Sequence, residues 1–269
     1  MTTPVTNNLA LFCDFENIAL GVRDAKYAKF DISKILERLL VKGSIVVKKA
    51  YCDWERYRDF KATMHEAAFE LIDIPHVRQS GKNSADIRMV VDALDLCYTK
   101  SHVKTFVIIS GDSDFSPLVS KLRENAKTVI GVGVKNSTSD LLINNCDEFI
   151  YYDDLVREQE SVRGGKKKSK PSRSKKKPAA SKAADGKQEG IDLAIETAKA
   201  LLSERGDQEV LWGSMVKQAL KRRRPGFNEE YYSFDSFSDL LEEAEARDLL
   251  KLELDQRSGG YIIRRVGPA

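Results

Sequence analysis

The stretch LFCDFENIAL, residues 11–20, places polar side chains directly after a run of apolar residues. Asp14 stands where a buried strand should end, and Glu16 and Asn17 follow it. An acid at the end of a hydrophobic strand gains little from local structure, so Asp14 is a candidate functional residue. Asn17 can serve beside it as a neutral ligand or as an orienting group.

Two further acidic segments can reach the same place. SGDSDF, residues 110–115, follows another apolar run and contributes Asp112 and Asp114, and Asp86 follows GKNSA at the start of an amphipathic stretch. Asp and Ser are also favoured at helix starts, so capping explains each of these acids equally well on its own. Together with Asp14 they indicate a site more strongly than any one of them does.

Carboxylates that lie a few ångströms apart repel and raise the pKa of one another unless a cation lies between them. Mg²⁺ is typically held by one or two carboxylates while water and substrate phosphate complete its shell. Such an ion can polarise a phosphoryl oxygen and activate water, which phosphodiester hydrolysis requires. We therefore expect a Mg²⁺ or Mn²⁺ site with the ligands Asp14, Asp86, Asp112 and Asp114.

The elements that must position these acids form an alternating pattern. The apolar runs predict strands at residues 9–13, 44–51, 69–74, 105–110, 128–134 and 148–152. The stretches between them have helix-like spacing, and this alternation predicts an α/β domain whose parallel sheet is covered by helices on both faces. With the strand order 3-2-1-4-5, the first and fourth strands adjoin where the order reverses, which is where ligands bind in such sheets.

A basic segment divides the chain of 269 residues. Residues 166–187 hold nine Lys and one Arg against one Asp, a net charge of +9, so the rest of the chain carries −6. This segment has no large apolar residue to offset the entropy of folding. We expect one domain at 1–158, a disordered basic linker at 159–188 and a second domain at 189–267.

The second domain has a different pattern. IDLAIETAKALL, the region around Trp212 to Leu220, and the region from Phe234 to Ala244 predict three helices, and LKLEL and YIIRR predict a hairpin. Three helices and a two-stranded wing make a small α+β winged helix. Its basic cluster of Arg222, Arg223 and Arg224 suits RNA, although a solvated helix end explains these residues nearly as well.

Aromatic and basic side chains near the acidic edge also suit RNA. CDWERYRDFK interleaves Trp54 and Tyr57 with Arg56, Arg58 and Lys61, and aromatic faces stack on unpaired bases while cations meet phosphates. The alternative is that Tyr57 and Phe60 simply face the core.

The residues after the fifth predicted strand offer a further contact. Lys135 and Ser137 precede a helix, where backbone N–H groups can hold a phosphate. Ordinary capping explains Ser137 as well. The expected partner of the chain is single-stranded RNA.

Over about residues 8–155 the chain resembles the NYN domain, the LabA-like branch of the PIN-like nucleases. The resemblance is carried by FCDFEN, GKNSADI, SGDSDFSPLV and STSDLLINNCDEFI. It implies a Rossmann-like sheet and a divalent-metal ribonuclease whose acidic ligands match Asp14, Asp86, Asp112 and Asp114, with Asn17 matching the amide.

The chain departs from this family at one place. Members commonly have Lys-Gly-Val-Asp where this chain reads Lys82-Asn83-Ser84-Ala85-Asp86, which is one residue longer. Lys82 is expected to contact RNA. The second domain resembles the OST-HTH, or LOTUS, domain, which implies RNA binding or recruitment of a protein partner.

Other function classes fit the chain less well. The four cysteines are widely spread without a C-x-x-C pair, which favours buried apolar roles over a zinc site. A phosphatase would need a D-x-D-x-T motif after the first strand and a nucleotide enzyme a phosphate-binding loop, and neither motif is present. A catalytically silent RNA-binding regulator remains the main alternative to a ribonuclease. Without a signal peptide or a long apolar segment, a cytoplasmic protein is expected.

Overall fold

The computed structural model describes residues 7–27, 29–75, 83–164, 180–205, 210–256 and 258–267. The chain divides into two compact units, Met1–Lys167 and Lys168–Ala269. Each unit has its own hydrophobic core.

The first unit contains a parallel sheet with the strand order β3-β2-β1-β4-β5-β6. Its strands are β1 (Asn8–Asp14), β2 (Ser44–Cys52), β3 (Glu70–Asp73), β4 (Val103–Ile109), β5 (Thr128–Gly133) and β6 (Glu148–Tyr151). The predicted sheet is confirmed, and so is the adjacency of the first and fourth strands. Strand order reverses between β1 and β4, so the sheet has its switch point there.

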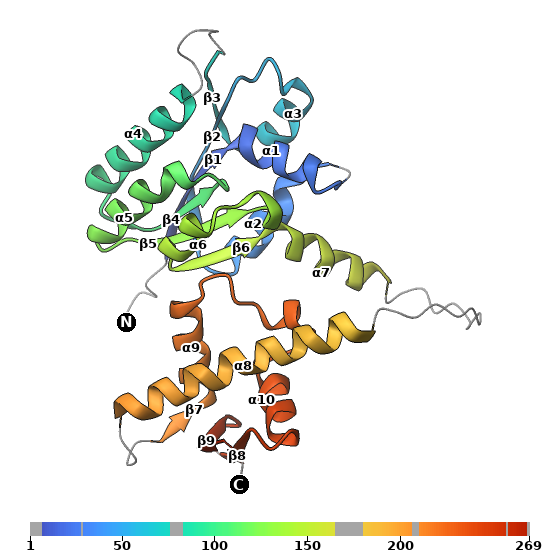
Figure 1. Cartoon of the computed structure of the whole chain (residues 1–269). Coiled ribbons are helices and arrows are strands. Elements are labelled where there is room, and N and C mark those ends of the chain that lie inside the picture. The colour runs from blue at the N-terminus through green and yellow to red at the C-terminus, as the bar shows by residue number, and fades with distance from the viewer. Residues whose placement is uncertain are drawn as a thin grey trace, which may run out of the picture. The chain divides into compact units, whose positions relative to one another are not determined.

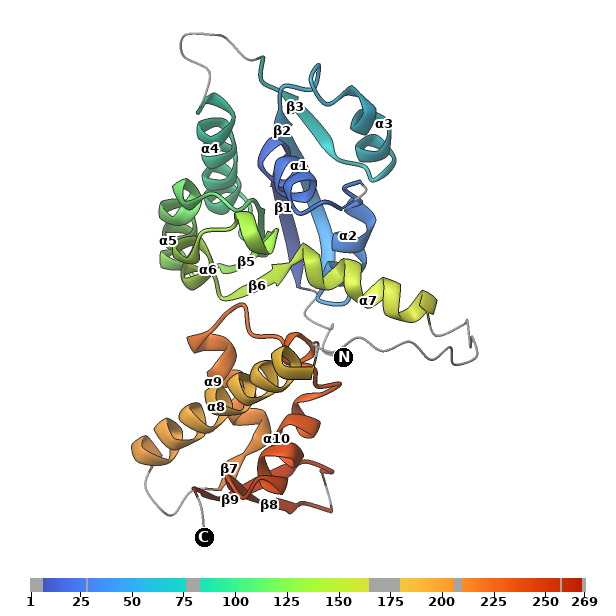
Figure 2. The same ribbon diagram turned by 45° about the vertical axis from the view of Figure 1, so that its right-hand side comes forward.

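Helices cover both faces of this sheet (Figures 1 and 2). One face is covered by α1 (Phe15–Asp24), α2 (Ile32–Leu40), α3 (Arg58–Glu66) and α7 (Tyr152–Gly164). The other is covered by α4 (Ser84–Thr99), α5 (Ser116–Glu124) and α6 (Asp140–Asn145). Strands buried on both sides read as continuous apolar runs, which is why the sequence revealed them.

The pleat of β1 shows how the two cores are separated. Leu9, Leu11 and Cys13 enter the core beneath α1 and α2, while Ala10 and Phe12 enter the core beneath α4 and α5. Successive side chains of a strand point to opposite faces, so one buried strand supplies both cores. All four cysteines are free and buried, as expected.

Helix α1 was not predicted. It begins at Phe15, directly after β1 ends at Asp14, so no loop separates the two elements. The polar residues that resemble a loop in the sequence are the first turn of this helix.

The expected linker is helical at both ends. Helix α7 continues through Gly164 and α8 (Ala180–Arg205) begins well before residue 188. Disorder across the whole of 159–188 is therefore wrong at these ends, because good helix formers such as Ala, Lys and Gln extend the packed helix α8 toward its N-terminus. Residues 165–179 lie outside the described residues.

The second unit contains helices and a three-stranded antiparallel sheet of order β7-β9-β8. After α8 come β7 (Leu211–Trp212), α9 (Gly213–Arg223), the short helix η3 (Glu229–Tyr232), α10 (Phe237–Ala246), β8 (Leu250–Leu254) and β9 (Tyr261–Val266). The expected hairpin is present, and β7 adds a third strand that the sequence pattern did not reveal. Among the described helices of the chain, none has the length and apolarity needed to cross a lipid bilayer.

Candidate active site

Asp14 lies at the switch point of the sheet with 8% of its surface exposed. Its Oδ1 accepts a hydrogen bond from the backbone N–H of Asn17 at 3.3 Å, so Asp14 caps α1. Its Oδ2 accepts a hydrogen bond from the hydroxyl of Ser110 at 3.0 Å. Asp14 therefore has a structural role as well, and the expectation that it gains little from local structure is wrong.

Hydrogen bonds also hold the segment after β4 next to Asp14 and Asn17. The Ser110 hydroxyl accepts a hydrogen bond from the backbone N–H of Asp112 at 3.2 Å. The side-chain oxygen of Asn17 accepts one from the backbone N–H of Gly111 at 2.8 Å. Because a backbone N–H can only donate, the Asn17 amide must turn its oxygen toward Gly111 and keep its NH₂ for other partners. This arrangement favours an orienting role for Asn17 over that of a neutral ligand.

Three of the four predicted acids line one cleft of about 550 Å³, namely Asp14, Asp86 and Asp112. Asp114 is exposed and instead lines a neighbouring cleft of about 700 Å³, together with Asp86. The four acids that were predicted to lie at one edge of the sheet therefore line two adjoining clefts, and Asp86 lines both of them. The extra residue between Lys82 and Asp86 does not remove Asp86 from the site.

The acidic cleft has a strong excess of negative charge. Glu16 and Asp53 also line it, and Arg56 is the one cation among its described lining residues. Arg56 is paired with Glu16 at 3.0 Å.

This crowding appears in the pKa values of two acids. Burial raises the pKa of Asp14 from 3.8 to about 7, with further contributions from the charges of Asp86 and Asp112, although the hydrogen bonds from Asn17 and Ser110 oppose the change. Burial and the charges of Asp112 and Asp114 raise the pKa of Asp86 to about 6. Both groups therefore exchange protons near neutral pH.

The donor set of the cleft fits a hard divalent cation held mainly by water and substrate. Among the described residues, no three Asp, Glu, His or Cys side chains form a group that could hold a metal ion. Mg²⁺ and Mn²⁺ accept carboxylate oxygens and need only one or two of them when water and phosphate supply the rest. The cleft is suited to that mode of binding and not to an all-protein cage.

Trp54 does not contribute an exposed ring to the site. It is 1% exposed, its indole N–H donates to the carbonyl oxygen of Ile72 at 3.2 Å, and its ring packs 5.0 Å from that of Phe15. The expectation that Trp54 stacks on a base is therefore wrong, because long-range packing places it in the core.

In the turn after β5, two of the backbone donors that were expected to hold a phosphate have partners within the protein. The backbone N–H of Lys135 donates to Asp153 at 2.8 Å, and that of Ser137 donates to the carbonyl oxygen of Val134 at 3.1 Å. These two donors are already used, so the expectation of a phosphate held by them is wrong. The side chain of Ser137 remains exposed.

The other predicted RNA contacts differ in their surroundings. Arg56 borders the acidic cleft, whereas Arg58 is an exposed partner of Glu55. Lys82 lies outside the described residues. In the second unit, Arg222 and Arg224 are exposed, while the guanidinium of Arg223 is paired with Glu196.

Comparison with known proteins identifies the first unit. The family model of the NYN domain matches residues 8–153, more than half of the chain, and this range includes Asp14, Asp86 and Asp112. The chain belongs to the NYN domain family. NYN domains are part of the PIN-like nuclease superfamily, whose α/β fold agrees with the sheet described above.

Two relatives show the extent of the similarity. The chain is 27% identical over 144 residues to the uncharacterized protein MJ0482 of Methanocaldococcus jannaschii, a match that covers 54% of this chain and 55% of the relative. The chain thus spans about half the length of this curated relative. A crystal structure of VPA0982 of Vibrio parahaemolyticus, a protein of unknown function, matches with a TM-score of 0.51 and 26% identity over 58% of this chain and 98% of that one.

The raised pKa of Asp14 predicts how the stability of the NYN domain depends on pH. In EDTA the unfolded chain releases the Asp14 proton near pH 4, whereas the folded chain keeps it to about pH 7. The free energy of unfolding of the wild type should therefore decrease as the pH rises from about 4 to about 7. Asp14→Asn should not show this contribution to the decrease. At about 1.4 kcal/mol per pKa unit the difference amounts to roughly 2–4 kcal/mol.

Urea unfolding of both proteins at pH 4.5, 6 and 8 measures this difference. The free energy of unfolding of Asp14→Asn relative to wild type should rise from pH 4.5 to 8. A constant or falling difference would mean that Asp14 is ionised in the folded protein at every one of these pH values.

Proposed function

We propose that the NYN domain is a divalent-metal-dependent ribonuclease that hydrolyses phosphodiester bonds of single-stranded RNA. The observation that carries this proposal is the convergence of Asp14, Asp86 and Asp112 on one cleft at the switch point, with the pKa values of two of them raised toward neutrality. Family membership supports a nuclease, and RNA is the substrate that NYN domains suggest.

Mg²⁺ or Mn²⁺ would be held by Asp14, Asp86 and Asp112, with Asp114 contributing from the neighbouring cleft. When bound, the ion supplies charge neutralisation at the phosphate and activation of water. The residues themselves supply position, since Ser110 and the N-terminus of α1 fix the Asp14 carboxyl.

The remaining polar groups of the cleft act on the substrate. The NH₂ of Asn17 can donate to a phosphate oxygen, because its carbonyl oxygen is held by Gly111. Arg56 stands at the border of the cleft, where its guanidinium can meet an adjacent phosphate.

Substitution of the converging acids should abolish RNA cleavage. Asp14→Asn and Asp112→Asn each keep the size of the side chain and remove its charge, so each should lower the rate of Mg²⁺- or Mn²⁺-dependent cleavage at least about 100-fold. Gel analysis of an end-labelled single-stranded RNA measures the loss, with EDTA as a second control. Asp95→Asn is a matched control, since Asp95 is an exposed acid on α4, the helix that also carries Asp86.

Three results would contradict the proposal in different ways. Cleavage that is equal in wild type and in the double variant would come from a contaminant or another site. RNA binding without cleavage in wild type would indicate the silent regulatory protein. Hydrolysis of a chromogenic phosphate monoester in preference to RNA would indicate a phosphatase.

We further propose that the second unit is a winged-helix domain of the OST-HTH, or LOTUS, type that binds RNA. Its three long helices pack on one core, and β8 and β9 form the wing. The exposed pair Arg222 and Arg224 ends α9 and is its most suitable contact for phosphate.

Charge reversal tests this second assignment. In the full chain, Arg222→Glu with Arg224→Glu should weaken binding of single-stranded RNA and lower the salt slope by about 0.7 for each phosphate that the variant no longer neutralises. Arg265→Glu in β9, an exposed residue of the same unit, is the control. Unchanged RNA affinity and salt slope in the double variant would favour a protein-recruiting role.

A further inference from the structure

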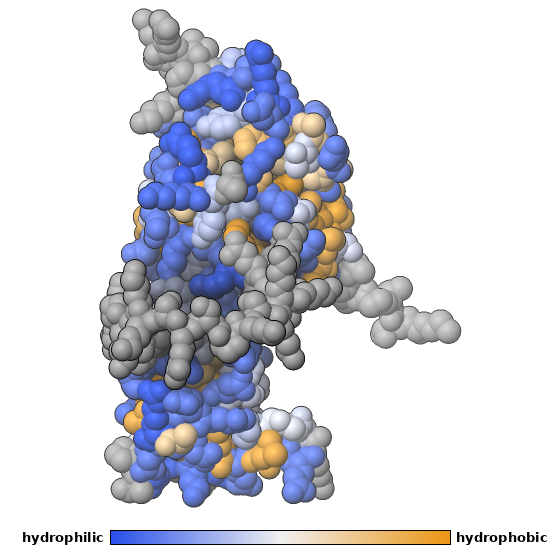
Figure 3. All heavy atoms as spheres, turned by 90° about the vertical axis from the view of Figure 1, so that its right-hand side faces the viewer, coloured by the Kyte–Doolittle hydropathy of each residue, from blue (hydrophilic) through white to orange (hydrophobic). Residues whose placement is uncertain are grey.

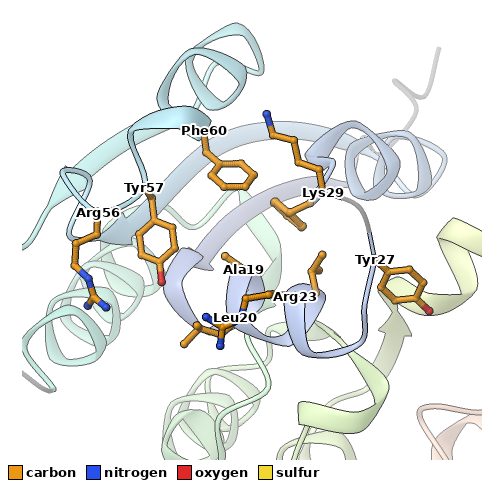
Figure 4. A pocket seen from close by; sticks show the side chains of 10 residues that line it. Ala19, Leu20, Arg23, Tyr27, Lys29, Arg56, Tyr57 and Phe60 are labelled. Carbon is orange, nitrogen blue, oxygen red and sulfur yellow. The ribbon is translucent and has the colours of Figure 1, made fainter.

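A second hollow of about 350 Å³ adjoins the acidic cleft. It is formed by α1, by Tyr27, Lys29 and Phe30, by Arg56 and Tyr57 just before α3, and by Phe60 in the first turn of α3 (Figure 4). Leu20 and Arg56 line both this hollow and the acidic cleft, so the two spaces share a border. We call it the aromatic hollow.

The aromatic rings of Tyr57 and Phe60 line the hollow. Tyr57 and Phe60 are partly exposed, and each packs on the buried ring of Phe15, with centroid distances of 5.5 and 5.2 Å. Figure 4 shows both rings on one side of the hollow, with Leu20 and Arg23 from α1 across from Tyr57. Phe15 thus fixes two rings that remain partly exposed.

The charged side chains that line the aromatic hollow are basic, although Arg23 is paired with Asp24 and Arg56 with Glu16. Its described lining residues include three cations, Arg23, Lys29 and Arg56, and no Asp or Glu. The Lys29 ammonium lies over the Phe60 ring, 5.0 Å from its centroid, which is a cation–π contact. The acidic cleft, by contrast, is lined by five carboxylate side chains and by Arg56.

Figure 3 looks onto the side of the molecule that carries α1 and α3, and hydrophobic side chains interrupt a mostly hydrophilic surface there. Aromatic faces next to cations are the arrangement that proteins use to hold unpaired bases and their phosphates.

We propose that the aromatic hollow binds one nucleobase, together with its adjoining phosphate, of the RNA strand whose scissile bond lies in the acidic cleft. The base stacks on Tyr57 and Phe60, and the phosphate is met by Arg23 and Lys29. Arg56, at the shared border, contacts the strand as it passes from one space to the other. This assignment rests on the proposed nuclease function and adds the position of a neighbouring nucleotide.

Removing the stacked base from the RNA and removing the aromatic ring from the protein should weaken RNA binding to a similar extent. The test uses the full chain carrying Asp112→Asn, which prevents cleavage, in Mg²⁺ with a labelled tetranucleotide RNA and its four single-abasic analogues. An abasic site leaves the number of phosphates unchanged, so the contribution of basic segments elsewhere in the chain cancels.

Loss of the base at one position should weaken binding about 5- to 100-fold, as expected for one base stacked on an aromatic ring. Phe60→Leu should weaken binding of the intact strand by a similar factor and have little further effect on that abasic strand. Leu keeps the apolar contact with Phe15, and thermal unfolding verifies the fold of the variant. Tyr57→Leu provides a second variant, and Tyr98→Leu on α4, where the tyrosine is 62% exposed, is the matched control.

Two results would overturn this assignment. If Phe60→Leu and Tyr57→Leu leave the affinity for the intact strand unchanged, or weaken the intact and all abasic strands equally, no base lies on these rings. If a free mononucleotide binds as tightly as the tetranucleotide, the hollow is a mononucleotide site. Failure of the nuclease proposal looks different, because wild type would then not cleave RNA while the base-dependent effect of Phe60→Leu persisted.

Discussion

The burial of one carboxyl group between two strand ends is the constraint on which the rest of the site depends. Asp14 is the last residue of β1 and the N-cap of α1, and its side chain accepts a hydrogen bond from the hydroxyl of Ser110, which follows β4. Burying an ionised carboxylate is costly unless hydrogen bonds compensate it. Here the two hydrogen bonds do not fully compensate burial and the neighbouring acids, so the pKa of Asp14 is raised to about 7. In this account a cation and a phosphodiester complete a site that the protein leaves electrostatically unbalanced.

The backbone around Asp14 holds the other groups in place. The backbone N–H of Gly111 donates a hydrogen bond to Asn17, and that of Asp112 donates one to Ser110. The first of these bonds joins α1 to the segment after β4 at the switch point. A side chain at position 111 would bring its Cβ to 2.4 Å from the carbonyl oxygen of Ser137, which explains the glycine between Ser110 and Asp112. The geometry of the acids thus follows from close backbone packing.

Much of the sheet and of the acidic cleft could be predicted from the sequence. Strands buried on both faces are visible as apolar runs, and the ends of neighbouring parallel strands meet at one edge, which brought Asp14 and Asp112 together. Interactions between residues distant in the sequence could not be predicted in this way. Trp54 stands beside cations in the sequence, yet Phe15 and Ile72 hold it in the core. The sequence indicated an RNA-binding role for the segment around Arg56 and Tyr57. It could not predict the aromatic hollow itself, because the hollow joins this segment to α1 and to Tyr27, Lys29 and Phe30.

Proton release on metal binding tests the central claim most directly. Calorimetric titration of the full chain with Mn²⁺, in buffers of different ionisation enthalpy, gives the number of protons released. With pKa values of about 7 for Asp14 and about 6 for Asp86, binding at pH 6.5 should release on the order of one proton, and at pH 8.5 almost none. Asp14→Asn should lose most of this release. Mn²⁺ binding at pH 6.5 without proton release, or with the same release in Asp14→Asn, would contradict the account.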